Sequence, residues 1–272
     1  MTFGMRDSNP TLLLPVPQPG AARTQAATEN QHNTMQNYCK TIGALAAASA
    51  LVAGNANAEV EYELHTGFTS EYLYRGVILG QSLVEAGADV KTEAYGLGLS
   101  AGAWYGSFEQ TGSNVTELDL YSDVSKDFGI LTGSVGYIYR SFDAGSNEES
   151  TGEVYFAAAH DFGFAKASLT YYWGVDDIAK ETTEGYTELA FSRSFELNSC
   201  LNLNVGTNVG YLADDGEFTA WTTKVALDWG FAEHAKLSPF VAVSVALGEQ
   251  SDTLWYNTAN EIVGGAMLSV GF

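Results

Sequence analysis

The stretch Leu201-Asn-Leu-Asn-Val-Gly-Thr-Asn-Val-Gly-Tyr211 alternates apolar and polar residues along most of its length. Its apolar face carries Leu201, Leu203, Val205, Val209 and Tyr211, and its polar face carries Asn202, Asn204, Gly206, Asn208 and Gly210. A period of two predicts a β-strand that is apolar on one side. A packed soluble core rarely tolerates so many Asn and Gly residues behind its aliphatic face, whereas a water-filled lumen accepts them. This stretch therefore predicts a strand with lipid on one side and water on the other.

The same alternation recurs along the chain from residue 60 onward. We predict twelve strands, at 60–75, 82–92, 95–106, 116–126, 131–142, 152–161, 164–174, 186–196, 201–212, 218–230, 238–247 and 261–272. Most have about the 9–11 residues that a tilted membrane-spanning strand requires. The predicted fold is all-β: a transmembrane, up-and-down, antiparallel β-barrel of about twelve strands.

The composition agrees with this fold and excludes other classes. The chain of 272 residues has 33 acidic and 12 basic side chains, a formal net charge of −21 and only 17% charged residues. Soluble domains usually contain about 25% charged residues. A chain this acidic repels phosphate backbones, so nucleic-acid binding is excluded. A mean hydropathy of −0.05 is too low for a bundle of transmembrane helices.

The predicted connections alternate between long and short. The long ones are Gly106 to Val115, Asp143 to Thr151, Val175 to Gly185 and Gly248 to Asn260, and the short ones lie around Glu93, Asp127 to Gly129, Asp161 to Gly163, Asn198-Ser199 and Ala232 to Ala235. Outer-membrane barrels have long extracellular loops and short periplasmic turns, and an even strand count returns both termini to the periplasm. A soluble β-sandwich or lipocalin-like barrel is the alternative, because its strands also alternate.

Aromatic residues at the strand ends favour the membrane barrel over the soluble alternative. Those near the long loops are Tyr72, Tyr74, Trp104, Tyr105, Tyr137, Tyr139, Tyr171, Trp173, Tyr211 and Trp221, and those near the short turns are Tyr95, Phe128, Phe162, Phe164, Phe195, Trp229 and Phe231. We interpret them as the two aromatic girdles that mark the membrane interfaces, which a soluble barrel does not need.

The first 58 residues are predicted to lie outside the barrel. Residues 35–58 combine a short basic segment, the run of 14 small and apolar residues from Thr41 to Gly54, and an Ala-x-Ala ending at Ala58. This is the pattern of a secretory signal peptide cleaved after Ala58, and the apolar run is too short for a membrane anchor. We predict that residues 1–34 are a mis-assigned start or a disordered extension, and that residues 59–272 form the barrel. After cleavage Cys200 is left as a single cysteine, so no disulfide forms within the mature chain.

The last predicted strand ends in an aromatic residue. Phe272 is the final residue and follows an alternating segment. A terminal aromatic on such a strand resembles the sorting signal by which the barrel assembly machinery recognises its substrates. We therefore predict insertion into the bacterial outer membrane after secretion through the periplasm.

Three short aromatic motifs suggest a family. Ser70-Glu71-Tyr72-Leu73-Tyr74-Arg75-Gly76, Gly102-Ala103-Trp104-Tyr105-Gly106-Ser107 and Glu117-Leu118-Asp119-Leu120-Tyr121 resemble motifs of the uncharacterised TorF-like porin family (Gcw_chp) of Gram-negative bacteria. The resemblance covers mainly the N-terminal half of the predicted mature chain. It implies an outer-membrane barrel of channel type and brings no substrate or catalytic residue with it.

If the apolar phase faces lipid, the opposite phase faces the lumen. The predicted pore-lining residues are Glu63, Glu71, Arg75, Glu85, Asp89, Glu117, Asp119, Asp123, Arg140, Lys166, Lys224 and Asp228. Acidic side chains outnumber basic ones in this phase, which favours cations. Twelve strands lie between the eight that side chains fill and the sixteen that leave an open channel. We therefore predict a narrow, cation-preferring channel for ions or small polar solutes, constricted at Asp119 and Asp123 with Lys166 and Lys224 as counter-charges.

Two other functions stay open. The inward charges could pair and fill the interior, which would make a structural or interaction barrel without conductance. Outer-membrane hydrolysis is the remote alternative, because His65, His160 and His234 offer a base, but no nucleophile is recognisable beside them. The sequence suggests no catalytic residue, metal site or cofactor. The expected partners are outer-membrane lipid, lipopolysaccharide, the barrel assembly machinery and small ions or solutes. The sequence leaves open whether the chain forms a homo-oligomer.

Overall fold

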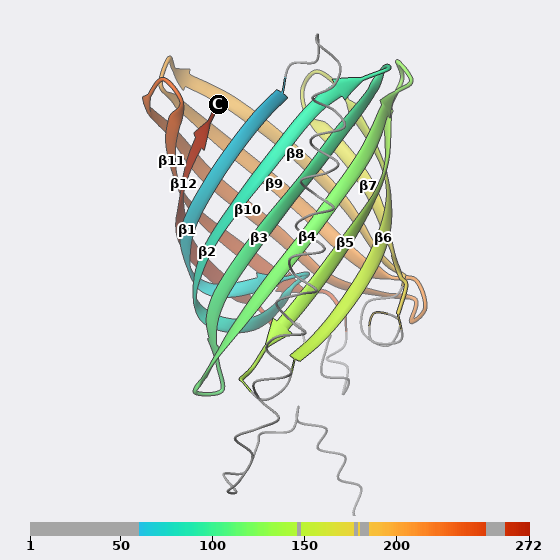
Figure 1. Ribbon diagram of the computed structural model, residues 1–272, viewed down its shortest axis with the longest axis vertical. Coiled ribbons are helices and arrows are strands. Elements are labelled where there is room, and N and C mark those ends of the chain that lie inside the picture. Colours follow the sequence, from blue (N-terminus) through green and yellow to red (C-terminus); the bar gives the residue numbers. More distant parts are fainter. Residues whose placement is uncertain (1–59, 146–147, 177–178, 180–184, 249–258) are drawn as a thin grey trace, which may run out of the picture. The chain divides into compact units, whose positions relative to one another are not determined.

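The computed structural model describes residues 60–145, 148–176, 179, 185–248 and 259–272, and these form one closed antiparallel β-barrel (Figure 1). Its strands are β1 (Val60–Tyr74), β2 (Val77–Ala94), β3 (Leu97–Gln110), β4 (Ser113–Asp127), β5 (Thr132–Asp143), β6 (Glu148–Asp161), β7 (Lys166–Gly174), β8 (Tyr186–Asn198), β9 (Leu201–Leu212), β10 (Glu217–Ala232), β11 (Ala235–Ala246) and β12 (Glu261–Gly271). Each strand pairs with its sequence neighbours, and β1 pairs with β12 to close the ring. The predicted all-β barrel of about twelve strands is confirmed.

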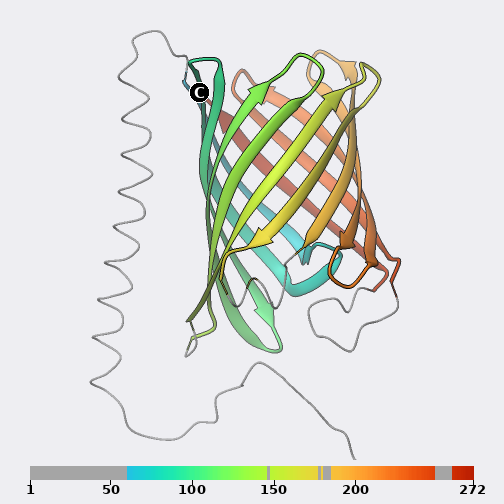
Figure 2. The same cartoon turned by 90° about the vertical axis from the view of Figure 1, so that its right-hand side faces the viewer.

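Both ends of the barrel chain lie at one rim. Glu63 of β1 is the register partner of Gly271 of β12, and the backbone N–H of Phe272 donates to the carbonyl of Tyr62. We call this rim the terminal end and the opposite rim the distal end; Figure 2 shows the C-terminus at the upper, terminal end. The predicted signal peptide and residues 1–34 lie outside the described residues and stay predictions.

The outer surface is apolar along the middle of the strands. Its exposed side chains include Leu64, Phe68, Val84, Val124, Val135, Phe156, Leu169, Val225, Val241 and Ile262. An exposed apolar band of this extent marks a surface that contacts lipid. Because the ladder is closed, no sheet edge is unpaired within that band. A structure that spans a membrane with strands needs all its backbone groups paired in this way. Among the described residues, no helix is long and apolar enough to cross a membrane.

The connection between β3 and β4 is tighter than the sequence predicted. The long loop expected from Gly106 to Val115 is wrong: β3 and β4 continue to a two-residue turn at Thr111-Gly112. Arg75-Gly76 and Tyr95-Gly96 form turns of the same kind, with positive φ at both residues. Such turns match the twist of a β-hairpin, and they admit a non-glycine residue at the first position at some cost in strain. The short turns predicted at Asp127 to Gly129 and Asp161 to Gly163 are confirmed.

Three residues of the predicted aromatic girdles face the lumen instead. Trp104 donates from Nε1 to Glu85, at 2.7 Å, and packs with Tyr72 against a buried cluster inside the barrel. The ring of Tyr74 lies beside the guanidinium of Arg75, which contacts the opposite inner wall. The prediction failed because it used residue type and nearness to a strand end, whereas Trp104 shares the inward phase of Gly102 and Gly98.

Inward glycines leave room for large rings on neighbouring strands. A Cβ at Gly102 would overlap the ring of Tyr121, whose hydroxyl donates to Asp89 at 2.7 Å. We expect Gly102→Ala to displace Tyr121 and lower the free energy of unfolding by about 1–3 kcal/mol, as overpacking does. Gly206→Ala is the control, because the nearest atom to its added Cβ lies 4.0 Å away. Urea unfolding in detergent followed by tryptophan fluorescence compares them, and equal stability of the two variants would contradict the packing described.

Candidate functional site

The lumen contains two adjoining cavities. The one nearer the terminal end has a volume of about 820 Å³ and is lined by Glu63, His65, Asp89, Lys166, Asn204, Asp228 and Lys236, among others. The second has a volume of about 600 Å³ and is lined by Glu71, Glu85, Trp104, Asp119, Asn208 and Val263, among others. We call them the terminal cavity and the inner cavity. Together they give the barrel a hollow interior in which charged and apolar side chains both line the walls, rather than a closely packed apolar core.

One basic side chain lies where the two cavities meet. Lys224 and Phe240 line both cavities, together with Ser192 and Gly206. The Nζ atom of Lys224 lies 3.8 Å from the centre of the Phe240 ring, a cation–π geometry. The region that the two cavities share therefore carries a basic side chain held against one wall.

The tip of the β1–β2 hairpin bends into the lumen at the distal end. The register pairs between β1 and β12 end at Thr69, and those between β2 and β3 begin at Gln81. The strand pairing described for residues 70–80 therefore joins β1 to β2. We call residues 70–80 the inward hairpin. In Figures 1 and 2 its cyan ribbon turns across the lower end of the barrel.

Apolar contacts hold one side of the inward hairpin against the inner wall. Leu83, Phe108 and Val115 form a buried cluster, with Tyr72 and Trp104 packed on it. The rings of Tyr72 and Phe108 meet edge to face with centroids 5.1 Å apart. Burying an aliphatic or aromatic side chain of this size contributes about 1.5–3 kcal/mol. The cluster therefore fixes the inward hairpin to β3 and β4.

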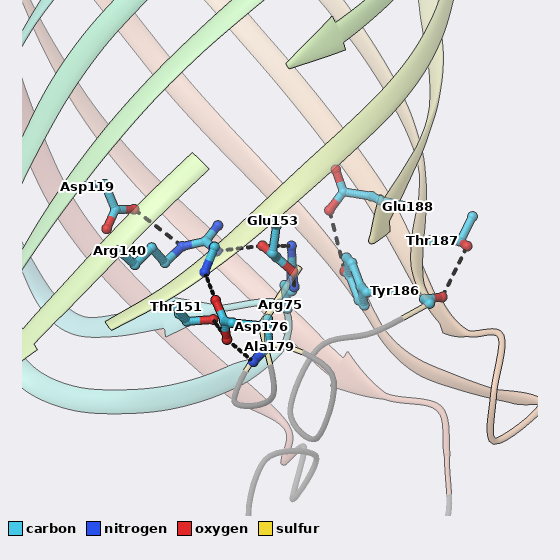
Figure 3. A network of polar contacts seen from close by, with 12 residues as sticks. Arg75, Asp119, Arg140, Thr151, Glu153, Asp176, Ala179, Tyr186, Thr187 and Glu188 are labelled. Carbon is cyan, nitrogen blue, oxygen red and sulfur yellow. Dashed lines mark hydrogen bonds and ion pairs between the residues drawn. The ribbon is translucent and has the colours of Figure 1, made fainter. Parts of the chain in front are cut away.

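A charged contact holds the hairpin tip to β6 on the opposite wall. Nη1 and Nη2 of Arg75 donate to the two carboxylate oxygens of Glu153, each at 3.0 Å (Figure 3). Arg140 also donates to Glu153, and its Nε lies 3.4 Å from Asp119. The Arg75 and Glu153 side chains are 7% and 0% exposed. A bidentate, charge-assisted pair of this kind is among the stronger polar contacts in proteins.

All twelve predicted pore-lining residues belong to the inner side of the barrel. Those that line a cavity are Glu63, Glu71, Glu85, Asp89, Asp119, Lys166, Lys224 and Asp228. Arg75 and Arg140 belong to the ion-pair network, and Glu117 is buried two residues before Asp119 on the same face of β4. Asp123 accepts a hydrogen bond from the hydroxyl of Tyr155 at 3.2 Å.

The pairing expected at the constriction differs from the one observed. Asp119 forms its ion pair with Arg140 rather than with a lysine. Lys236 and Asp161, which the sequence reasoning left out, line the terminal cavity. Lys236 was missed because its strand was predicted to begin at 238. Alternation from Phe240 back through Ser238 places Lys236 in the inward phase.

His65 and His160 each contact a group on a neighbouring strand or turn. Nδ1 of His65 lies 3.4 Å from Asp89, and a Cβ at Gly87 would overlap its Nε2, so the ring leans toward β2. Nδ1 of His160 lies 2.5 Å from the carbonyl oxygen of Ile130, and its ring meets Phe162 edge to face. Within the described ranges, no group of three or more His, Cys, Asp or Glu residues is arranged to hold a metal ion.

Comparison with known proteins gives one sequence family and a set of similar folds. A model for a family described as "Bacterial protein of unknown function (Gcw_chp)" matches residues 53–245. No curated protein gives a significant sequence match.

Three solved barrels illustrate the structural matches. The COG4313 outer membrane channel from Pseudomonas putida F1 aligns with a TM-score of 0.49 and 9% identity, covering 78% of this chain and 95% of that one. A KdgM porin in complex with disordered oligogalacturonate gives 0.43 and 12%, covering 78% and 98%. Outer membrane phospholipase A from Escherichia coli gives 0.43 and 14%, covering 77% and 89%. Likenesses at these values say nothing about solute or activity.

Proposed function

The chain belongs to the Gcw_chp family of bacterial proteins of unknown function, and we propose that it is a narrow, cation-preferring channel rather than an enzyme. A closed antiparallel barrel with an even number of strands and an apolar exterior is the architecture of bacterial outer-membrane proteins. The outer membrane is therefore where this barrel resides. In the proposed orientation the terminal end faces the periplasm and the distal end faces the cell exterior. Specific contacts with lipopolysaccharide, the assembly machinery or a second copy stay predictions.

The observation that carries the proposal is the charged lining of the two adjoining cavities. The residues that line them include seven acidic and four basic ones, and the basic Arg193 stacks on the outward-facing Phe195. In a confined passage with low-dielectric walls, an excess of one sign raises the local concentration of the opposite ion. Potassium should therefore enter the lumen more readily than chloride.

The preference for potassium over chloride should depend on the carboxylates that line the lumen. We expect the double variant Glu63→Gln/Asp228→Asn to lower the potassium-to-chloride permeability ratio, because both side chains line the terminal cavity. Reversal potentials across planar bilayers under a KCl gradient measure that ratio. It should also fall for the unmodified protein at high salt, where the Debye length shrinks to about 3 Å at 1 M.

The matched control removes the same formal charge outside the lumen. Asp214→Asn/Asp215→Asn changes two carboxylates in the exposed turn between β9 and β10. This variant should keep the permeability ratio of the unmodified protein. If the two double variants behave alike, the selectivity does not arise in the terminal cavity.

One observation favours the second function, a barrel that does not conduct. The inward hairpin and its buried cluster occupy the distal part of the lumen. The proposed channel therefore has a small resting conductance that increases when the hairpin is released. If a correctly folded barrel carries no current after the inward hairpin is released, that result favours the structural function.

A further inference from the structure

The side chain of Arg75 occupies a site that the opposite wall supplies. Its guanidinium carbon lies 4.2 Å from the ring centre of Tyr172 and 4.4 Å from that of Tyr186. Both guanidinium Nη atoms donate to Glu153, as described above. We call Glu153, Tyr172 and Tyr186 the Arg75 site. The three residues come from β6, β7 and β8, so the site is built without the inward hairpin.

The chemistry of the Arg75 site matches a planar organic cation. The two oxygens of Glu153 fit the fork of a guanidinium, and aromatic faces attract cations when they are desolvated. A strongly hydrated spherical ion makes neither the fork contact nor the stacking contact as well. The hydroxyl of Tyr186 is directed toward Glu188 at 3.5 Å, which adds another carboxylate beside the site.

The charge balance of the site favours a cation. Arg75 and Arg140 both pair with Glu153, and Arg140 also faces Asp119, so removing Arg75 takes one positive charge away from these two carboxylates. A buried carboxylate that loses a partner is costly, whereas a replacement cation offsets that cost. Release of Arg75 is therefore favoured when another cation takes its place.

The inward hairpin has the backbone irregularities that release would require. The β1–β2 register shifts between Tyr72 and Leu73, and the β2–β3 register shifts between Gln81 and Val84. Ser82 has a φ of 55°, which is unusual for a residue other than glycine. These irregularities flank residues 73–80, so that the tip can move without breaking the ladder that closes the barrel.

We infer that the Arg75 site binds planar organic cations of the guanidinium type, and that Arg75 is its built-in occupant. A solute that enters from the distal end competes with Arg75 for Glu153, Tyr172 and Tyr186. The inward hairpin is released when the solute displaces the Arg75 side chain. The inference rests on the proposed channel and names the class of solute for which it opens.

The test uses full-length protein with Arg75→Ala, and the probe is guanidinium chloride at millimolar concentration. In planar bilayers we expect Arg75→Ala to conduct more potassium than the unmodified protein. Guanidinium should then reduce the current of this variant with saturation, while sodium chloride at the same concentration should not. Adding Glu153→Gln should raise the guanidinium concentration that halves the current by about tenfold or more, because the charged hydrogen-bond acceptor is lost. Lys91→Ala is the matched control. Lys91 lies two residues after Asp89 in the same phase of β2, near the terminal end, with Glu61 of β1 as its register partner. The variant should carry the same current as the unmodified protein and respond to guanidinium in the same way.

A second readout does not depend on conductance. Guanidinium should raise the temperature at which folded Arg75→Ala converts to the slowly migrating form on gels, and it should not do so for the unmodified protein. Arg75→Gln replaces Arg75→Ala if the alanine variant does not fold.

The outcomes separate the site from the channel. If guanidinium neither blocks nor stabilises the variant, while the unmodified protein conducts, the site inference is wrong and the channel stands. If guanidinium stabilises the variant but no form conducts, the site stands and the channel proposal is wrong. Equal potassium currents in Arg75→Ala and the unmodified protein would contradict release of the hairpin.

Discussion

Glu153→Ala should lower the free energy of unfolding of the barrel by about 3–5 kcal/mol, the range for removing one partner of a buried ion pair. Glu153 is fully buried and accepts hydrogen bonds from both Arg75 and Arg140. Its loss leaves two buried guanidinium groups without their shared carboxylate. No exposed ion pair would produce a comparable effect, since such pairs contribute about 0–1 kcal/mol.

Urea unfolding in detergent, followed by the shift in gel mobility of unheated samples, measures the change. Asp215→Ala is the control, because it removes a carboxylate from an exposed turn. Since Arg75 and Glu153 contact each other, the double variant with Arg75→Ala should lose less than the sum of the two single changes. A Glu153→Ala barrel as stable as the control would show that the network does not hold the distal end together.

Val225→Arg should impair assembly by about 2–4 kcal/mol, the cost of a basic residue on the lipid face near the midplane. Val225 is 41% exposed on the outer surface, and its register partners are Val205 and Val241. Asn204→Arg should be far milder, because Asn204 lines the water-accessible terminal cavity.

The fraction of each variant that reaches the folded, heat-modifiable form in membranes provides the comparison. The pair tests the inside–outside assignment on adjacent strands with the same introduced side chain. Equal damage from the two substitutions would mean that the assignment is wrong.

Alternation alone was enough to predict the barrel because it reflects a local constraint. Each residue of a strand faces either lipid or lumen, and the stretch from Leu201 to Tyr211 shows this without reference to any other strand. The number of strands, and which residues of each strand face the lumen, could therefore be predicted from the sequence. Strand ends did not follow from it: β3 and β4 run on through residues that have the composition of a polar loop.

The inward hairpin could not be read from the pattern. Its sequence, from Ser70 to Gly80, is aromatic and aliphatic and resembles an ordinary strand end. What bends it inward is a shift of register near Tyr72 and the end of pairing with β12 at Thr69. Both depend on which residues of distant strands face each other, and alternation carries no information about register.

The Arg75 site shows the same limit more clearly. Arg75 was predicted to face the lumen, and Glu153 shares that phase, but they lie 78 positions apart in the chain. Their contact arises because a hairpin of β1 and β2 crosses to β6. The inferred selectivity for planar cations thus depends on a long-range contact that only the folded barrel reveals.

The reversal potential of the purified barrel in a planar bilayer under a KCl gradient tests the channel proposal most directly, measured for the unmodified protein and for Arg75→Ala. We expect both to show preference for potassium over chloride, with a larger current for Arg75→Ala. Preference for chloride, or the absence of current in both proteins when gel mobility shows that they are folded, would contradict a cation-preferring channel.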